Sequence, residues 1–219
     1  FLWTYDNGEA DKNTFRTKAE IEIPFEGVEY QKIYRFDDIA DRLYMKMHNM
    51  TIRTEILREH QIRIDEHCYY VDTEYILYPI PYVKTICFVD AFVYYYRLGR
   101  EGQSVGLEKM QKNEQNYDKV LSSLLSFYQQ LGKQLPCTDI KKRYIAGLIA
   151  RVIAGKFKIM LSFPPSAEKK QQLRQYDRTL KEQYRDIYDS NINKAVSLLR
   201  KTQYHTYYLA NMLVRRTYR

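Results

Sequence analysis

The spacing of apolar residues differs between the two halves of the chain. From about residue 106 onward, apolar residues recur every three to four positions, which is typical of amphipathic helices. Proline residues interrupt this pattern at Pro136 and at Pro164-Pro165, and Ser166 is a candidate N-cap for the helix that follows. The pattern therefore predicts four helical segments, at about 108–131, 139–162, 166–188 and 191–216.

The first half of the chain mixes short patterns of both kinds. The segments with strand-like composition or two-residue alternation are Phe1–Tyr5, Glu20–Ile23, Thr85–Val89 and Phe92–Arg97. The segments with helical spacing are Asp37–Met47, Arg53–His60 and Thr73–Tyr78. We therefore expect an α+β chain, in which a segment of mixed sheet is followed by a C-terminal helical bundle.

Charge divides the chain in the same place. Residues 1–105 contain 13 Lys and Arg against 18 Asp and Glu, whereas residues 106–219 contain 22 against 9. The net charge of +8 is thus the sum of an acidic half and a strongly basic half. Such segregation predicts two domains with different neighbours, at 1–105 and 106–219.

Composition excludes several classes of protein. The 8 Gly and 6 Pro are too few for a fibrous or linker-like chain, and the 3 Cys are too few for a disulfide framework. The cysteines therefore indicate reduced thiols in an intracellular compartment. The longest apolar stretch, Ile145–Phe163, contains three basic residues, which makes it a poor candidate for a membrane span. The chain begins with Phe rather than Met, which suggests a piece of a longer protein.

Polar chemistry is concentrated in the run His67–Tyr75. Asp72 and Glu74 lie where an extended segment is expected to become a helix, so both carboxylates meet the positive end of the helix dipole. The commoner role for such an Asp is to cap the helix. The alternative is a general base that accepts a proton from a bound hydroxyl. One carboxylate can serve both roles, because it has two oxygens.

A second polar run, Tyr94–Ser104, follows a predicted strand and contains two arginines and two glycines. Guanidinium groups bind phosphate or carboxylate through paired hydrogen bonds, so this loop is a candidate for binding an anionic substrate. The alternative is a solvated turn in which Arg97 pairs with Glu101. The spacing of a phosphate-binding Walker A loop is absent.

The order of these motifs resembles the C-terminal half of family 2 glycosyltransferases, the inverting GT-A enzymes of bacterial polysaccharide synthesis. The resemblance is carried by "YYVDTEY" (Tyr69–Tyr75) and "YYYRLGREGQS" (Tyr94–Ser104). The stretch "MHNMTIRTEILREHQIRIDE" (Met47–Glu66) is similar to the family segment that leads into its acidic motif. The tail "FPPSAEKKQQLRQYDRTLKEQY" (Phe163–Tyr184) is similar to an appendage carried by one bacterial subgroup.

The resemblance implies roles for individual residues. Asp72 corresponds to the catalytic base that deprotonates the acceptor hydroxyl. Residues 1–105 would then be the acceptor-side part of a GT-A-like catalytic domain, and 106–219 its basic helical appendage. The Gln-x-x-Arg-Trp motif of processive synthases is absent, so processive synthesis is not expected. The residues that would support Asp72 or contact donor diphosphate and acceptor are Glu74, Arg97, Arg100, Gln103 and Ser104.

The resemblance also implies a cofactor and partners. Family members bind the nucleotide-sugar through an N-terminal half and hold Mg²⁺ or Mn²⁺ through an Asp-x-Asp motif, and this chain contains neither. We therefore expect the divalent cation, the donor and a sugar or lipid-linked acceptor to bind the full-length enzyme, and this fragment alone to be inactive. The expected location is cytoplasmic, with the basic tail at the inner face of the cell membrane.

A different class of function remains open, namely a non-catalytic basic helical module that binds an anionic membrane or nucleic acid. In this interpretation Asp72 only caps a helix. The helix near 141–162, rich in Lys and Arg, is either buried against its neighbours or in contact with anionic lipid. Binding to nucleic acid is not expected, because the positive charge lies in regular amphipathic helices and no RNA- or DNA-binding signature is present.

Overall fold

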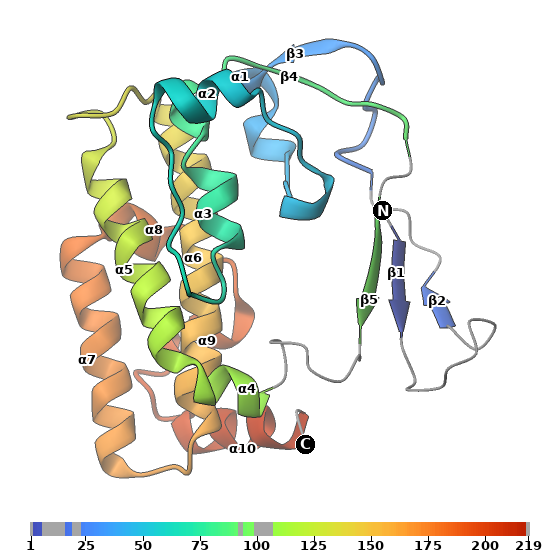
Figure 1. Ribbon diagram of the computed structural model, residues 1–219. Helices are drawn as coiled ribbons and strands as arrows, with labels where there is room; N and C mark the ends of the chain where they lie inside the picture. The colour runs from blue at the N-terminus through green and yellow to red at the C-terminus, as the bar shows by residue number, and fades with distance from the viewer. Residues whose placement is uncertain (1, 6–15, 19–22, 92–93, 99–106, 218–219) are drawn as a thin grey trace. The chain divides into compact units, whose positions relative to one another are not determined.

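The computed structural model describes residues 2–5, 16–18, 23–91, 94–98 and 107–217 and has an α+β fold (Figure 1). Contacts divide the chain into two compact units. Unit 1 comprises residues 1–64 and 72–104, and unit 2 comprises residues 65–71 and 105–219. Sequence analysis did not group the segment 65–71 with the helices of the second half.

Unit 1 contains two small sheets. In the first, β1 (Leu2–Tyr5) lies between β2 (Arg16–Lys18) and β5 (Tyr95–Leu98), antiparallel to β2 and parallel to β5. In the second, β3 (Ile33–Arg35) pairs antiparallel with β4 (Thr85–Cys87). The two strand-like runs that follow one another at 85–97 therefore belong to different sheets. Nothing local in the sequence distinguishes this arrangement from a hairpin, since strand partners are chosen by tertiary contacts.

The helices of unit 1 are short. They are α1 (Phe36–Ile39), η2 (Ala40–Arg42), η3 (Met47–Asn49), α2 (Thr54–Glu59), α3 (Asp72–Leu77) and η4 (Ile80–Tyr82). The predicted helices at 53–60 and 73–78 are confirmed as α2 and α3 to within a residue.

The continuous helix predicted over Asp37–Met47 is wrong, because the backbone becomes extended at Leu43 (φ −92°, ψ 130°). Ile39 and Leu43 are nevertheless both buried, so the apolar spacing that suggested a helix is satisfied by two short turns instead. Short helices have little stability of their own, and tertiary packing decides where they end. Of the predicted strand at 20–23, the structure describes Ile23, which lies in no strand.

Unit 2 is helical, and α6 (Asp139–Ser162) lies at its centre (Figure 1). Helices α4, α5, α7, α8 and α10 all contact α6. The remaining bounds are α4 Leu107–Lys112, α5 Glu114–Gln130, α7 Ala167–Gln183, α8 Arg185–Asp189, α9 Lys194–Lys201 and α10 Tyr207–Thr217. Buried side chains follow α6 along almost its whole length, including Lys141 and Lys156. The interpretation of this helix as buried against its neighbours is therefore confirmed.

Three of the four predicted helical segments are each divided into two helices. The breaks lie at Asn113, at Tyr184 and between α9 and α10. At the last of these, Gln203 and Tyr204 have left-handed backbone conformations (φ 49° and 66°), and the Tyr204 side chain is buried. A left-handed residue cannot continue a right-handed helix, so burial of Tyr204 is associated with a helix break that periodicity does not reveal.

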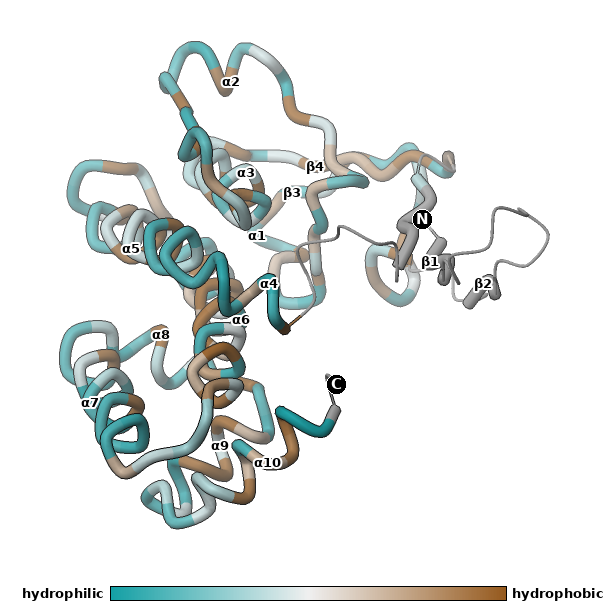
Figure 2. The backbone as a smooth tube through the Cα atoms, turned by 60° about the horizontal axis from the view of Figure 1, so that its bottom comes forward, coloured by the Kyte–Doolittle hydropathy of each residue, from teal (hydrophilic) through white to brown (hydrophobic). Residues whose placement is uncertain are grey.

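The residues at which α6 and α7 begin are set by hydrogen bonds to nearby side chains. The Ser166 Oγ accepts a hydrogen bond from the Lys169 backbone amide (3.0 Å), as predicted for an N-cap. Thr138 caps α6 in the same way through the Lys141 amide (3.2 Å). Figure 2 shows that α7 is largely hydrophilic, whereas α6 carries hydrophobic residues along its length. Among the described residues, no helix combines the length and apolar character that crossing a bilayer requires.

Candidate functional site

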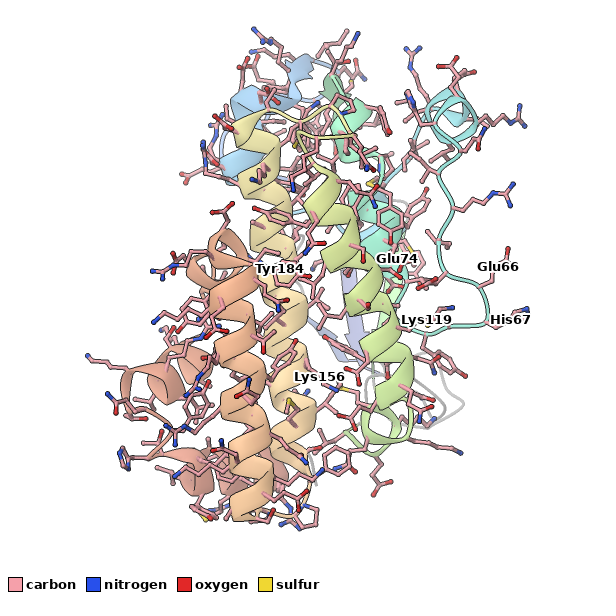
Figure 3. All side chains as sticks on the ribbon, turned by 90° about the vertical axis from the view of Figure 1, so that its left-hand side faces the viewer. Glu66, His67, Glu74, Lys119, Lys156 and Tyr184 are labelled. Carbon is pink, nitrogen blue, oxygen red and sulfur yellow. The ribbon has the colours of Figure 1, made fainter. Side chains whose placement is uncertain are left out.

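The segment 65–71, which precedes Asp72, is held against α5. The Ser123 hydroxyl donates a hydrogen bond to Asp65 Oδ2 (3.0 Å), and the Lys119 ammonium lies 3.4 Å from Asp65 Oδ1. The same ammonium donates to the backbone carbonyl of Glu66 (3.4 Å), and Figure 3 shows Lys119 beside the turn formed by Glu66 and His67. Side chains of α5 therefore determine the position of this turn.

The backbone of this segment is strained. His67 (φ 52°) and Tyr70 (φ 73°) both lie in the left-handed region, which bulky side chains rarely adopt. The Tyr70 ring packs against Tyr117 of α5, with 5.1 Å between ring centroids, and burial raises the pKa of the Tyr70 phenol. Strained residues persist where surrounding contacts hold them, and they are concentrated at functional sites. The strain here ends two residues before Asp72.

Asp72 is the first residue of α3, and its side chain is exposed. The structure therefore places it one residue beyond the N-cap position expected for it. Negative charge is stabilising at this end of a helix, and the exposed carboxylate is accessible to a ligand. This position fits both alternatives for Asp72, a helix-stabilising acid and a proton acceptor.

Glu74 lies in the first turn of α3 and is completely buried. A side chain in this position does not reach a substrate, so the predicted direct contact of Glu74 with donor or acceptor is not supported. A supporting role within α3 is compatible with the burial. The physical reason is helical geometry, since residues two positions apart on a helix point about 200° apart around its axis.

The predicted loop residues are only partly described. Arg97 lies in β5, where its backbone pairs with Thr4 of β1 in parallel register. Arg100, Gln103 and Ser104 lie outside the described residues. Their role in binding diphosphate and acceptor stays a prediction.

The described residues do not fit the divalent cation that the resemblance implies. Hard cations bind several carboxylate and carbonyl oxygens at once. Within the ranges that the structure describes, no three His, Cys, Asp or Glu side chains come together in a way that would hold a metal ion. Asp37 and Asp38 lie in the first turn of α1, where negative charge is stabilising. No cation is therefore assigned to these residues.

Sequence analysis missed a charged cluster inside unit 2. The buried Lys156 ammonium of α6, labelled in Figure 3, has two acidic partners on α5. It lies 2.7 Å from Glu114 Oε1 and 2.6 Å from Asp118 Oδ1. The signal was available, because Glu114 and Asp118 are four residues apart and so share one helix face. This cluster joins two helices and leaves Lys156 unavailable for an external anion.

A second buried ion pair joins α7 to α9. Two guanidinium nitrogens of Arg200 donate to Asp177 Oδ1 (2.8 and 3.0 Å), and a third donates to the Tyr188 carbonyl (2.9 Å). The basic residues of the second half therefore include structural cations as well as exposed ones.

A shallow pocket of about 310 Å³ lies in unit 2 between α6 and the turn before α9. Its lining contains none of the predicted site residues, so it does not bear on Asp72. The residues that line it are Ala150, Arg151, Ala154, Asn191, Ile192, Asn193 and Lys194.

The candidate base is thus an exposed carboxylate at the start of α3 in unit 1. The strained turn at residues 65–71 belongs to unit 2, where α5 holds it. This geometry and the order of the motifs are the observations that bear on function. Comparison of the chain with protein-family models, with curated proteins and with solved structures finds no match.

Proposed function

We propose that this chain is the acceptor side of an inverting glycosyltransferase of GT-A type, with Asp72 as its general base. The observation that carries the proposal is the exposure of Asp72 at the start of α3, in the motif that resembles the acidic motif of family 2 enzymes. The parallel pairing of β1 with β5 is compatible with a fragment of the mixed sheet that such enzymes contain.

The proposed reaction is a single displacement. An acceptor hydroxyl lies within hydrogen-bond distance of the Asp72 carboxylate, about 2.6–3.2 Å. As the acceptor oxygen attacks the anomeric carbon, its proton passes to Asp72. The bond from that carbon to the nucleoside diphosphate breaks on the opposite face, and the bonding electrons leave with the diphosphate. The configuration at the anomeric carbon is therefore inverted.

The residues that precede Asp72 in the sequence are held by contacts within unit 2. The contacts of Asp65 with Ser123 and Lys119 and of Tyr70 with Tyr117 hold the residues directly before Asp72. Glu74, which is completely buried in the first turn of α3, is proposed to support this helix and not to transfer a proton.

The substitution Asp72→Asn in the full-length protein tests the proposal. Asn keeps the size of the side chain and its affinity for a helix start, but it is not a base. We expect sugar transfer to fall about 10²- to 10⁴-fold, the usual loss when a general base is removed. Release of nucleoside diphosphate from UDP-, GDP- and dTDP-sugars measures the activity, and thermal unfolding should be unchanged.

Glu66→Gln is the matched control. Glu66 is exposed and lies in the same turn, where Lys119 contacts its backbone carbonyl rather than its side chain. This variant removes one negative charge six positions before Asp72 in the sequence and should retain wild-type activity. Equal activity of wild type and Asp72→Asn would remove Asp72 from the mechanism, and an inactive wild type would contradict sugar transfer as a whole.

A further inference from the structure

Helix α10 is fixed to the rest of unit 2 by one side. Tyr207 and Asn211, four residues apart, are completely or almost completely buried. The Asn211 amide donates hydrogen bonds to the carbonyls of Leu161 (2.7 Å) and Phe163 (2.8 Å), at the C-terminal end of α6. These carbonyls have no partner within their own helix, so Asn211 locks α10 across the end of α6.

The other side of α10 is exposed and apolar. Tyr208, Leu209, Met212 and Leu213 are exposed to 50, 50, 56 and 52%. Residues at positions i, i+1, i+4 and i+5 lie on one face of a helix, so these four form a continuous stripe. Single exposed apolar residues are ordinary, whereas a contiguous apolar stripe on a fixed helix indicates an interaction surface.

Positive charge borders this stripe. Arg215 and Arg216 lie in the last turn of α10, and Figure 2 shows the hydrophilic end of the helix after its hydrophobic residues. The Lys170 ammonium of α7 lies 5.9 Å from the centroid of the Tyr208 ring. From Ser190 to Arg219 the sequence contains six Lys and Arg and no Asp or Glu.

The combination of an apolar stripe with cations at its border indicates which class of partner fits this surface. A second copy of the chain would bring the same cations face to face, which like-charge repulsion opposes. Nucleic acid would engage the cations but would leave Leu209 and Met212 without an apolar partner. A bilayer with anionic headgroups complements both features, because apolar side chains enter the headgroup–acyl boundary while cations contact phosphates.

We propose that α10 is an interfacial helix that binds the surface of an anionic lipid bilayer. It lies in the plane of the interface, inserts the stripe formed by Tyr208, Leu209, Met212 and Leu213, and places Arg215 and Arg216 at the headgroups. This inference is independent of sugar transfer, since it rests on exposure and charge in unit 2 alone.

Sedimentation of the 219-residue chain with vesicles tests the proposal. Vesicles of phosphatidylglycerol and phosphatidylcholine should bind the chain, and vesicles of phosphatidylcholine alone should bind it much less. The double substitution Arg215→Gln/Arg216→Gln should weaken binding to the anionic vesicles about 30-fold, since each cation near the surface contributes about fivefold. Leu209→Gln/Met212→Gln should weaken it about 10-fold or more, because it removes most of the inserted apolar surface.

Two control variants match these changes elsewhere in unit 2. Leu198→Gln replaces a leucine on α9 that is equally exposed (51%), and Arg174→Gln/Arg178→Gln removes two exposed charges from α7. Both should bind nearly as the wild type does. All substituted residues are exposed or half-buried, so thermal unfolding should not distinguish the variants.

Three outcomes would overturn the proposal. The first is a wild type that does not prefer anionic vesicles. The second is an equal loss of binding in the control variants, which would assign binding to general charge. The third is that the α10 variants abolish binding to a labelled RNA oligonucleotide, or self-association in analytical ultracentrifugation, without weakening binding to vesicles.

Discussion

Two tyrosines of unit 2 bury their hydroxyl groups in different ways. The Tyr128 hydroxyl of α5 donates a hydrogen bond to Asp186 Oδ2 at 2.9 Å. The Tyr176 hydroxyl of α7 is buried and has no hydrogen-bond partner among the described residues. A buried hydroxyl without a partner loses its hydration and gains nothing in return. Removing the two hydroxyls should therefore have opposite consequences.

The first prediction compares Tyr128→Phe with Tyr176→Phe. Tyr128→Phe breaks a hydrogen bond to a carboxylate and should lower the free energy of unfolding by about 1 kcal/mol. Tyr176→Phe removes an unpaired polar group and should leave the free energy of unfolding unchanged or raise it by up to about 1 kcal/mol. Urea unfolding followed by circular dichroism measures both. A loss in Tyr176→Phe as large as that in Tyr128→Phe would show that its hydroxyl has a partner.

At the scale of elements, α5 and α6 pack closely at Gly155. The Tyr117 ring of α5 lies against this glycine, and its hydroxyl donates to the Val152 carbonyl of α6 at 2.7 Å. A Cβ atom at Gly155 would overlap the Tyr117 phenol. Gly147 lies in the same helix, and a Cβ atom there would meet nothing within 4 Å. One glycine is therefore needed for packing between helices, and the other is not.

The corresponding prediction concerns Gly155→Ala and Gly147→Ala. Alanine in a helix is favoured over glycine by about 0.5–1 kcal/mol, so Gly147→Ala should stabilise unit 2 by that amount. Gly155→Ala should instead destabilise it by about 1–3 kcal/mol, the usual cost of overpacking. Adding Tyr117→Phe to Gly155→Ala should recover part of the loss, because the overlapping hydroxyl is gone. Thermal unfolding that rises for both glycine variants would contradict this description of the contact.

At the scale of the whole molecule, burial of phenols links the stability of unit 2 to pH. Burial raises the pKa of Tyr117, Tyr128, Tyr176 and Tyr204 above the ordinary value of tyrosine. For Tyr204 the negative charge of Asp177 raises the pKa further. The folded state therefore keeps these four protons at a pH where the unfolded chain has lost them. The contribution of these phenols to the free energy of unfolding is fully present below about pH 10, and it is lost as the pH rises above that value.

We accordingly expect unit 2 to unfold in alkaline solution as these phenols ionise. Helical circular dichroism and the ultraviolet absorbance of tyrosinate, followed together above about pH 10, should change in one transition for the buried tyrosines. The double variant Tyr128→Phe/Tyr176→Phe should move this transition to higher pH. Ionisation of all tyrosines near pH 10 with the helices intact would show that the four phenols are not buried as described.

The sequence by itself determined features that depend on neighbouring residues. The bounds of α6, residues 139–162, follow from apolar periodicity between prolines, and the Ser166 cap follows from side-chain chemistry one turn away. The start of a helix at Asp72 was predicted to within one residue for the same reason. Each of these signals depends on residues a few positions apart, so it does not depend on the fold.

The tertiary structure alone decided features that join distant residues. The separation of β4 and β5 into two sheets, the break of the last helix at the buried Tyr204 and the burial of Glu74 have no local signal. The hydrogen bond between Ser123 and Asp65, which helps to hold the turn before Asp72, spans 58 positions of the chain. Periodicity shows which residues prefer burial, but packing selects their partners, and it is packing that exposes Asp72 and the stripe on α10.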